Sequence, residues 1–264
     1  MGVLNLTPDS FAGSAPADPS AAVAMALQME ADGADIIDAG GESTRPGATP
    51  VSAGEELARV LPVIGTLSGR LKIPLSIDTS KASVAQAAVE AGAVVINDVT
   101  GLRADPALAS VAAASGAALV LMHTRGTPQT MRDQAVYRDL VGEIAAELGE
   151  GIAFAVAAGV AIERIICDPG IGFAKRSSHS YGVLGRLPEL AAALERPLLV
   201  GPSRKSFMRQ ALADRPAVER DWGTAAAVTA AVLAGAHIVR VHAVREMAQV
   251  VRVAEEIRGQ VENG

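Results

Sequence analysis

The chain has 264 residues, a formal charge of −6 at pH 7 and a hydrophobic content of 50%. This length fits one α/β barrel or two smaller domains. The negative charge argues against a nucleic-acid surface, and no apolar run is long enough to cross a bilayer, so we expect neither nucleic acid nor a membrane as partner.

Short apolar runs recur along the chain, and most of them end on a polar residue. Longer segments with helical spacing lie between them, and a capping box of Ser52 and Glu55 opens one of these. We predict strands near residues 2–5, 36–39, 75–78, 94–97, 118–122, 165–168, 198–201 and 238–241. We predict helices over residues 21–29, from 52 onward, and over 82–91, 106–114, 139–158, 181–194, 223–234 and 244–257.

Eight strands that each precede a helix favour a parallel (β/α)8 TIM barrel, an α/β fold, as a single domain over residues 1–264. An open doubly wound sheet is the alternative. That fold has less support, because no Gly-x-Gly-x-x-Gly motif opens a helix after the first strand.

The stretch Cys167–Phe173 is the most informative part of the chain. A short apolar strand ends on Asp168, and a Gly-rich turn follows. A buried carboxylate costs free energy unless something binds it, so Asp168 indicates a binding site. We interpret Cys167 as a small buried hydrophobic residue. A lone cysteine excludes an internal disulfide and, with no secretory signal at the start, predicts the cytoplasm.

In a barrel, the carboxyl ends of the strands meet at one mouth, where active sites of this fold lie. Carboxylates and amides there suit a flat polar heterocycle, because they accept from ring N–H groups and amides also donate. Basic side chains suit an anion, and Arg45 adds to them. The residues that we expect at this mouth are Asn5, Asp78, Asn97, Asp168, Lys205, Arg240 and His242.

Each of these residues also has a simpler interpretation. Asp78 alone would fit a helix cap, and Asn97 with Asp98 would fit a turn. Arg240 lies within a strand and points either into or out of the barrel. His242 alone would fit a core histidine, and we interpret His179 and His237 as structural. The shared position at strand ends favours the site.

Seven motifs in this order resemble the dihydropteroate synthases of the folate pathway, almost from end to end. The motifs are Met1–Phe11, Gly40–Gly47, Ile77–Lys81, Ile96–Asp98, Asp168–Phe173, Gly201–Ser206 and Arg240–His242. The resemblance implies that a 6-hydroxymethyl-dihydropterin diphosphate and para-aminobenzoate are the small-molecule substrates. The amine of para-aminobenzoate displaces diphosphate and gives dihydropteroate.

The resemblance also implies roles for individual residues. Asn5 would hold Mg²⁺ on the diphosphate, and Arg240 and His242 would bind its oxygens. Thr44 and Arg45 would close over that end. The ring would be gripped by Asp78, Asn97, Asp168 and Lys205, the catalytic set would be Asp78, Lys205, Arg240 and His242, and the remaining substrate contacts would be Phe11, Pro46, Met122, Phe173 and Ser203.

The sequence departs from the family pattern at several points. Residues 12–14 lack an acid that the family usually has, and Ala174 stands where glycine is common. A pterin-binding relative with weakened catalysis therefore remains an alternative. A methyltetrahydrofolate-type methyltransferase is another, although it needs neither the Ser203–Lys205 stretch nor the Arg240/His242 cluster. The resemblance further implies a homodimer, which the Ala-rich late helices would form.

Overall fold

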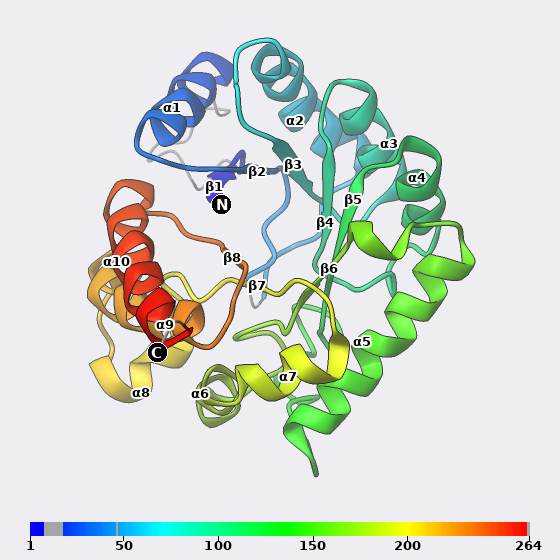
Figure 1. Ribbon diagram of the computed structural model, residues 1–264. Helices are drawn as coiled ribbons and strands as arrows, with labels where there is room; N and C mark the ends of the chain where they lie inside the picture. Colours follow the sequence, from blue (N-terminus) through cyan, green and yellow to red (C-terminus); the bar gives the residue numbers. More distant parts are fainter. Residues whose placement is uncertain (8–17, 46, 263–264) are drawn as a thin grey trace.

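The computed structural model describes residues 1–7, 18–45 and 47–262, and its strands form a ring that helices surround (Figure 1). All strand pairs are parallel, as the sequence predicts. The strands are β1 (Gly2–Asn5), β2 (Ile37–Gly40), β3 (Leu75–Asp78), β4 (Val95–Asp98), β5 (Ala118–Met122), β6 (Ile165–Asp168), β7 (Leu199–Val200) and β8 (Ile238–Val239).

The ring consists of a six-stranded sheet, β1 to β6, and a two-stranded sheet of β7 and β8. Single parallel bridges join the two sheets at both junctions, between Cys167 and Leu198 and between Gly2 and Val241. At the second junction the Val3 amide donates to the Val241 carbonyl at 3.0 Å, and the Val241 amide donates to the Met1 carbonyl at 2.9 Å. The eight strands therefore follow one another around an α/β barrel.

Helices cover the outside of this ring (Figure 1). Ser52 caps α2 by accepting from the Glu55 amide at 3.2 Å, as the sequence predicts. The α-helices are α1 (Pro19–Ala31), α2 (Ala53–Ser68), α3 (Ala82–Glu90), α4 (Ala107–Ser115), α5 (Leu140–Ala157), α6 (Ser177–Gly185), α7 (Leu187–Leu194), α8 (Arg209–Leu212), α9 (Asp221–Leu233) and α10 (Val244–Glu262). Single 3-10 turns lie at Ile162–Arg164, Ser206–Met208 and Ala217–Glu219.

One helix prediction was wrong. We expected one continuous helix over residues 181–194. The structure has two helices there, α6, which begins at Ser177, and α7, and they are separated at Arg186 (φ −117°, ψ 21°). Pro188 explains the break, because proline is favoured in the first turn of a helix and disfavoured in the interior. In the described part of the chain, no helix is long and apolar enough to cross a membrane.

The interior of the ring has two chemically different ends. At the amino ends of the strands, a small apolar cluster fills it, separate from the large core between strands and helices. Side chains two residues apart on a strand share a face, so the next inward position on each strand lies nearer the mouth. The apolar cluster comprises Met1, Val95, Val120 and Leu199, with Ile36, Ala118, Ile166 and Ile238 packed against it.

Candidate active site

The strand register brings the predicted residues of β1, β3 and β4 into one row, with Gly40 of β2 between the first two. Asn5 pairs with Gly40, Gly40 with Asp78, and Asp78 with Asn97. Register partners in a parallel sheet point to the same face. Met122 of β5 pairs in the same way with Asp168 of β6. The structure therefore brings these predicted residues together inside the mouth of the barrel.

Asp38 of β2 lies at the centre of this polar end, and the sequence interpretation missed it. Its side chain is fully buried. Its Oδ2 accepts from Arg240 Nε at 2.6 Å and from Asn97 Nδ2 at 3.0 Å. A carboxylate within the apolar run 36–39 is the signal that could have revealed it, since a buried acid needs a partner.

Arg240 points into the barrel and connects two strands. Besides Asp38, its Nη2 donates to Asp78 Oδ2 at 2.7 Å. Burial raises the pKa of Asp78 to about 7, although Arg240 opposes this shift and Asp38 adds to it. Asp78 therefore changes its charge near neutral pH, and its interpretation as a helix cap was wrong, since Lys81 occupies that position of α3.

Asn97 and Asp98 have different roles. Asn97 points inward to Asp38 and is 2% exposed, so the turn interpretation does not hold for it. Asp98 does hold a turn, because its carboxylate accepts from the amides of Thr100 and Leu102. The side chains of His237 and Cys167 are structural as expected: His237 Nδ1 accepts from the Leu198 amide at 3.2 Å, and Cys167 is fully buried.

Asp168 is held by the Gly-rich turn that follows it. Its Oδ1 accepts from the Gly170 amide at 2.7 Å. Gly170 has φ +69°, and a Cβ there would lie 2.0 Å from the His123 carbonyl oxygen, so only glycine fits. Burial raises the pKa of Asp168, while Lys205 opposes the shift. Asp168 is therefore a buried acid that needs positive charge nearby to stay ionised.

Lys205 lies between the end of β7 and this turn. Its Nζ donates to the Ile171 carbonyl at 2.6 Å and lies 4.4 Å from the centre of the Phe173 ring. Burial lowers the pKa of Lys205 to about 8, and Asp168 opposes that shift. The ammonium group thus links Asp168, the turn and Phe173.

The ends of β7 and β8 form a second, basic part of the site. Ser203 Oγ lies 2.9 Å from His242 Nδ1, and the His242 amide donates to Ser203 Oγ at 3.2 Å. Burial, followed by the positive charges of Arg240, Arg204 and Arg45, lowers the pKa of His242 to about 4. A neutral imidazole among three guanidinium groups is a suitable place for an anion.

The loop after β2 lies at the edge of the mouth. Lys81 joins Glu42 of this loop to the fully buried Glu56 of α2. Farther along, Thr44 is half-buried, Arg45 is exposed, and the Gly47 amide donates to the Pro128 carbonyl at 3.1 Å. The predicted contacts Phe11 and Pro46 lie outside the described residues.

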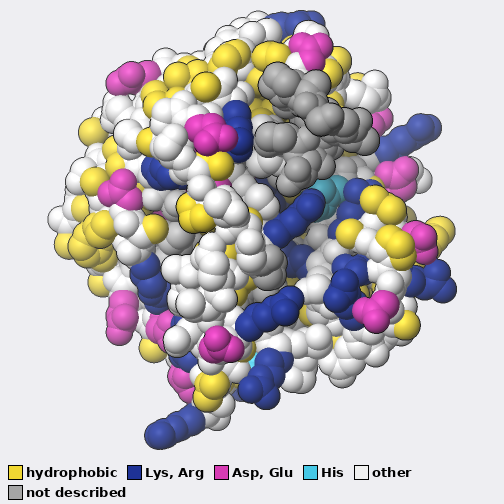
Figure 2. Space-filling model, turned by 180° about the vertical axis from the view of Figure 1, so that it is seen from behind, with side chains coloured by type: hydrophobic (Ala, Val, Ile, Leu, Met, Phe, Trp, Pro, Cys, Tyr) yellow, Lys and Arg dark blue, Asp and Glu magenta, His cyan; other side chains and the backbone are white. Residues whose placement is uncertain are grey.

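The opposite side of the molecule from that of Figure 1 shows where positive charge gathers. Several Lys and Arg side chains lie close together near the middle of that face (Figure 2). The whole chain carries a charge of −6, so this concentration is local. Local positive charge on an acidic protein is expected to attract an anionic substrate.

Asn5 is the residue that the family resemblance assigns to Mg²⁺. It is half-buried at the end of β1 and shares its row with Asp78. Among the described residues, no group of three His, Cys, Asp or Glu side chains could hold a metal ion. Mg²⁺ is often held by one or two carboxylates together with substrate phosphates and water. The amide oxygen of Asn5 is a neutral donor, so the phosphates would supply the negative charge of such a site.

The arrangement can therefore bind a polar ring at buried carboxylates and an amide, with an anionic group at the basic residues. This site and the barrel define the class of protein. The pterin binding enzyme family matches residues 1–242, and the chain belongs to that family.

Similar proteins narrow this class to one activity. The chain is 48% identical to dihydropteroate synthase of Synechocystis sp. over 259 residues, which cover 97% of this chain and 89% of that protein. It is 47% identical over 98% of its length to folic acid synthesis protein fol1 of Schizosaccharomyces pombe, of which it spans 36%. The structure of Xanthomonas albilineans dihydropteroate synthase with 4-aminobenzoic acid matches with a TM-score of 0.91 and 40% identity, covering 98% of this chain and 92% of that one.

Proposed function

We infer that this chain has dihydropteroate synthase activity. It condenses 6-hydroxymethyl-7,8-dihydropterin diphosphate with para-aminobenzoate and releases diphosphate and 7,8-dihydropteroate. The observation that carries this inference is the meeting of buried Asp78, Asn97 and Asp168 with basic residues at one end of the barrel interior. A ligand with a polar ring and an anionic group satisfies both sets of residues.

Pterin recognition uses the buried polar residues. The carboxylates of Asp78 and Asp168 accept from ring N–H and amino groups, and Asn97 both donates and accepts. Lys205 supplies positive charge beside Asp168. Arg240 keeps Asp78 oriented through the 2.7 Å hydrogen bond, so the carboxylate is in place before the ring arrives.

Departure of diphosphate is the step that needs electrostatic help. The C–O bond breaks, negative charge grows on the leaving diphosphate, and the positive charge left on the methylene carbon is delocalised into the pterin. The amine nitrogen of para-aminobenzoate then bonds to this carbon and gives up one proton, which the released diphosphate or water takes up. Arg240, His242 and Arg45 stabilise the negative charge on the diphosphate. This stabilisation lowers the activation free energy of C–O bond cleavage. An aromatic amine is nucleophilic when neutral, so no strong general base is required.

A Mg²⁺ ion, when bound, would neutralise diphosphate charge, and Asn5 is the residue that would hold it. Thr44 would close over the same end. The para-aminobenzoate would lie against Phe173 and Ser203, together with Phe11 and Pro46, and Met122 would be a further substrate contact beside Asp168. Phe173 is half-buried and already fixed by Lys205, which supports this role.

The chain forms a homodimer through α9 and α10 in this proposal. Large apolar side chains are exposed there, including Trp222 at 89%, Val253 at 61% and Ile257 at 49%. Exposed apolar patches of this kind mark interaction surfaces. We place the enzyme in the cytoplasm, since Cys167 is an unpaired thiol and fits a reducing compartment.

One assay tests the activity against its alternatives. The purified chain is given the pterin diphosphate and Mg²⁺, and diphosphate release is measured with and without para-aminobenzoate. Release that depends on para-aminobenzoate supports the proposal. Tight pterin binding without release indicates a relative with weakened catalysis, and methyl transfer from methyltetrahydrofolate to a corrinoid acceptor indicates the methyltransferase.

A further inference from the structure

Tyr137 lies in the loop between β5 and α5, and none of the proposed steps uses it. Its hydroxyl donates to the Ala174 carbonyl, in the turn after β6, at 2.9 Å. Burial raises the pKa of Tyr137 to about 12, so the hydroxyl keeps its proton and is the donor. Ala174 is 1% exposed, which leaves its carbonyl little access to water. The hydrogen bond therefore joins two loops at residues that are 37 positions apart in the chain.

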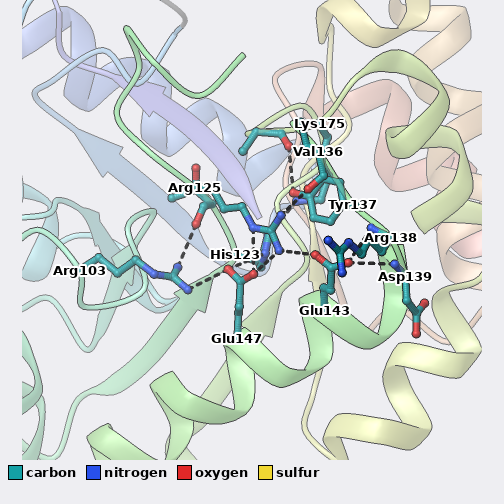
Figure 3. Close-up of polar contacts among 12 residues, drawn as sticks. Arg103, His123, Arg125, Val136, Tyr137, Arg138, Asp139, Glu143, Glu147 and Lys175 are labelled. Carbon is teal, nitrogen blue, oxygen red and sulfur yellow. Dashed lines mark hydrogen bonds and ion pairs between the residues drawn. The ribbon is translucent and has the colours of Figure 1, made fainter. Parts of the chain in front are cut away.

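Arg125 holds the ring of Tyr137 in place. Its guanidinium carbon lies 4.3 Å from the centre of that ring, and its Nη1 donates to the Val136 carbonyl at 2.6 Å. Its Nε donates to Glu147 at 2.8 Å and its Nη2 to Glu143 at 2.8 Å, and both acids lie on α5 (Figure 3). A guanidinium bound to two carboxylates of one helix has a fixed orientation. The tyrosine is thus anchored to α5 through this arginine.

The hydrogen bond to Ala174 acts on the residue directly before it, Phe173. Ala174 has φ +46°, so the chain changes direction there. The Phe173 amide donates to the Gly170 carbonyl at 3.0 Å, within the turn. The Phe173 carbonyl accepts from Lys175 Nζ at 3.2 Å, and this Nζ also lies 2.8 Å from His123 Nδ1. The backbone of Phe173 is therefore fixed on both sides of its Cα atom, and the tyrosine hydroxyl binds the next carbonyl along the chain.

We propose that Tyr137 is a positioning residue for para-aminobenzoate: its hydrogen bond to the Ala174 carbonyl keeps Phe173 in place against this substrate. The inference rests on the proposed function, in which the Phe173 ring contacts para-aminobenzoate. Asp168 has a separate anchor, since it accepts from the Gly170 amide at 2.7 Å. Loss of the tyrosine hydroxyl should therefore affect one substrate and leave recognition of the pterin ring unchanged.

The first test is Tyr137→Phe, which removes only the hydroxyl. The ring keeps its contact with Arg125 and its edge-to-face contact with His179, whose centre lies 5.1 Å away. Diphosphate release is measured with each substrate varied in turn. We expect the KM for para-aminobenzoate to rise about three- to tenfold, because a buried hydrogen bond is lost at the Ala174 carbonyl. At saturating para-aminobenzoate the rate should recover, so kcat should stay within about twofold of the wild type.

Two controls show whether the effect is specific. The KM for the pterin diphosphate and the calorimetric Kd for bare 6-hydroxymethyl-dihydropterin should stay within about twofold of the wild type in Tyr137→Phe, because the pterin contacts are retained. Tyr181→Phe removes the hydroxyl of the other tyrosine of the chain. Its ring packs against Phe207 at 5.0 Å, a contact that phenylalanine retains, so this variant should have wild-type KM values for both substrates.

A double-mutant cycle tests whether Tyr137 acts through Phe173. Phe173→Leu removes the ring and should itself raise the KM for para-aminobenzoate. In that background, adding Tyr137→Phe should raise the KM further by less than about twofold, because residues that act through one another are not additive. A tyrosine with a structural role alone would give effects on KM that add in full.

The outcomes separate the two proposals. The role of Tyr137 is overturned by an unchanged KM for para-aminobenzoate in Tyr137→Phe, by an equal rise in the KM of both substrates, or by full additivity in the cycle. A wild-type KM in Phe173→Leu also overturns it. Wild-type protein that releases no diphosphate in response to para-aminobenzoate contradicts the proposed function instead.

Discussion

The apolar end and the polar end of the barrel interior are separated by only two residues along a strand. Val95, Ile166 and Ile238 belong to the apolar cluster, and the residues two positions later are Asn97, Asp168 and Arg240. The apolar end is packed and excludes water. The polar end contains charged groups that are hydrogen-bonded to one another and can bind a ligand.

This difference separates stability from function within one fold. Burial of aliphatic side chains stabilises the folded state by roughly 1.5–3 kcal/mol each. Buried charges such as Asp38, Asp78 and Arg240 contribute less reliably, since desolvation offsets their attraction. The comparison predicts that changes at the apolar end lower stability and that changes at the polar end alter ligand binding.

The largest effect is expected at the apolar end. Leu199→Ala removes a fully buried side chain and leaves a cavity, so the free energy of unfolding should fall by about 2–5 kcal/mol. Denaturant titration measures this loss. The pterin affinity of the folded variant should stay within about threefold of the wild type, and a large loss of affinity would show that the two ends are not independent.

Asp168→Asn is the corresponding change at the polar end. It keeps the shape but replaces an acceptor oxygen by a donor that faces ring N–H groups. The unpaired donors should cost roughly 2–4 kcal/mol of binding, or about 30- to 1,000-fold in affinity. Calorimetry with 6-hydroxymethyl-dihydropterin measures it, and near-normal affinity would mean that Asp168 only shapes the turn.

Asp78 predicts a smaller, pH-dependent effect. Because its pKa is raised to about 7, the carboxylate takes up a proton as the pH falls through 7 and loses an acceptor. Pterin affinity should fall about tenfold between pH 8 and pH 6 through this group. The contribution of Asp78 to stability changes with pH in the opposite direction. Between about pH 4 and 7 the folded state binds this proton more tightly than the unfolded chain does, so the free energy of unfolding rises as the pH falls.

The matched variant for that effect is Asp78→Asn, which has no titrating group at this position. The tenfold change in pterin affinity between pH 8 and pH 6 should be absent in this variant, even if its affinity is lower at every pH. A variant with the same pH dependence as the wild type would assign the titration to another group, of which Asp168 and Lys205 are the nearest candidates.

The smallest effect concerns Ala174, which lies in the turn after β6. It has φ +46°, a left-handed conformation that alanine adopts at a cost. Ala174→Gly should raise the free energy of unfolding by about 0.5–1 kcal/mol, after the greater entropy of glycine in the unfolded chain is included. A lower thermal midpoint for this variant would show that the methyl group of Ala174, which is 1% exposed, contributes more than the strain costs.

Local sequence signals were sufficient for the strands and for the placement of several candidate residues at one end of the barrel interior. Each predicted strand lies within two residues of an observed one, because apolar runs that end on a polar residue are characteristic of this fold. Asp78, Asn97 and Asp168 were found through their position at strand ends. Asp38 was missed because it lies inside a strand, where only its charge distinguishes it from its neighbours.

Other features depend on contacts that local patterns do not encode. The direction of Arg240 is set by Asp38 and Asp78, which are 202 and 162 residues away. Lys175 and His123 are 52 residues apart, and neither belongs to a motif that indicates the other. The break between α6 and α7 was predictable from Pro188, but the apolar spacing on both sides of it hid the signal.

The central claim is that the polar end of the barrel interior recognises the pterin ring. The most direct test is a crystal structure of the protein with 6-hydroxymethylpterin bound. The account predicts that ring nitrogens and the amino group lie within hydrogen-bond distance of Asp78, Asn97 and Asp168. A ring bound elsewhere, or bound at the mouth without contacts to these three side chains, would contradict it.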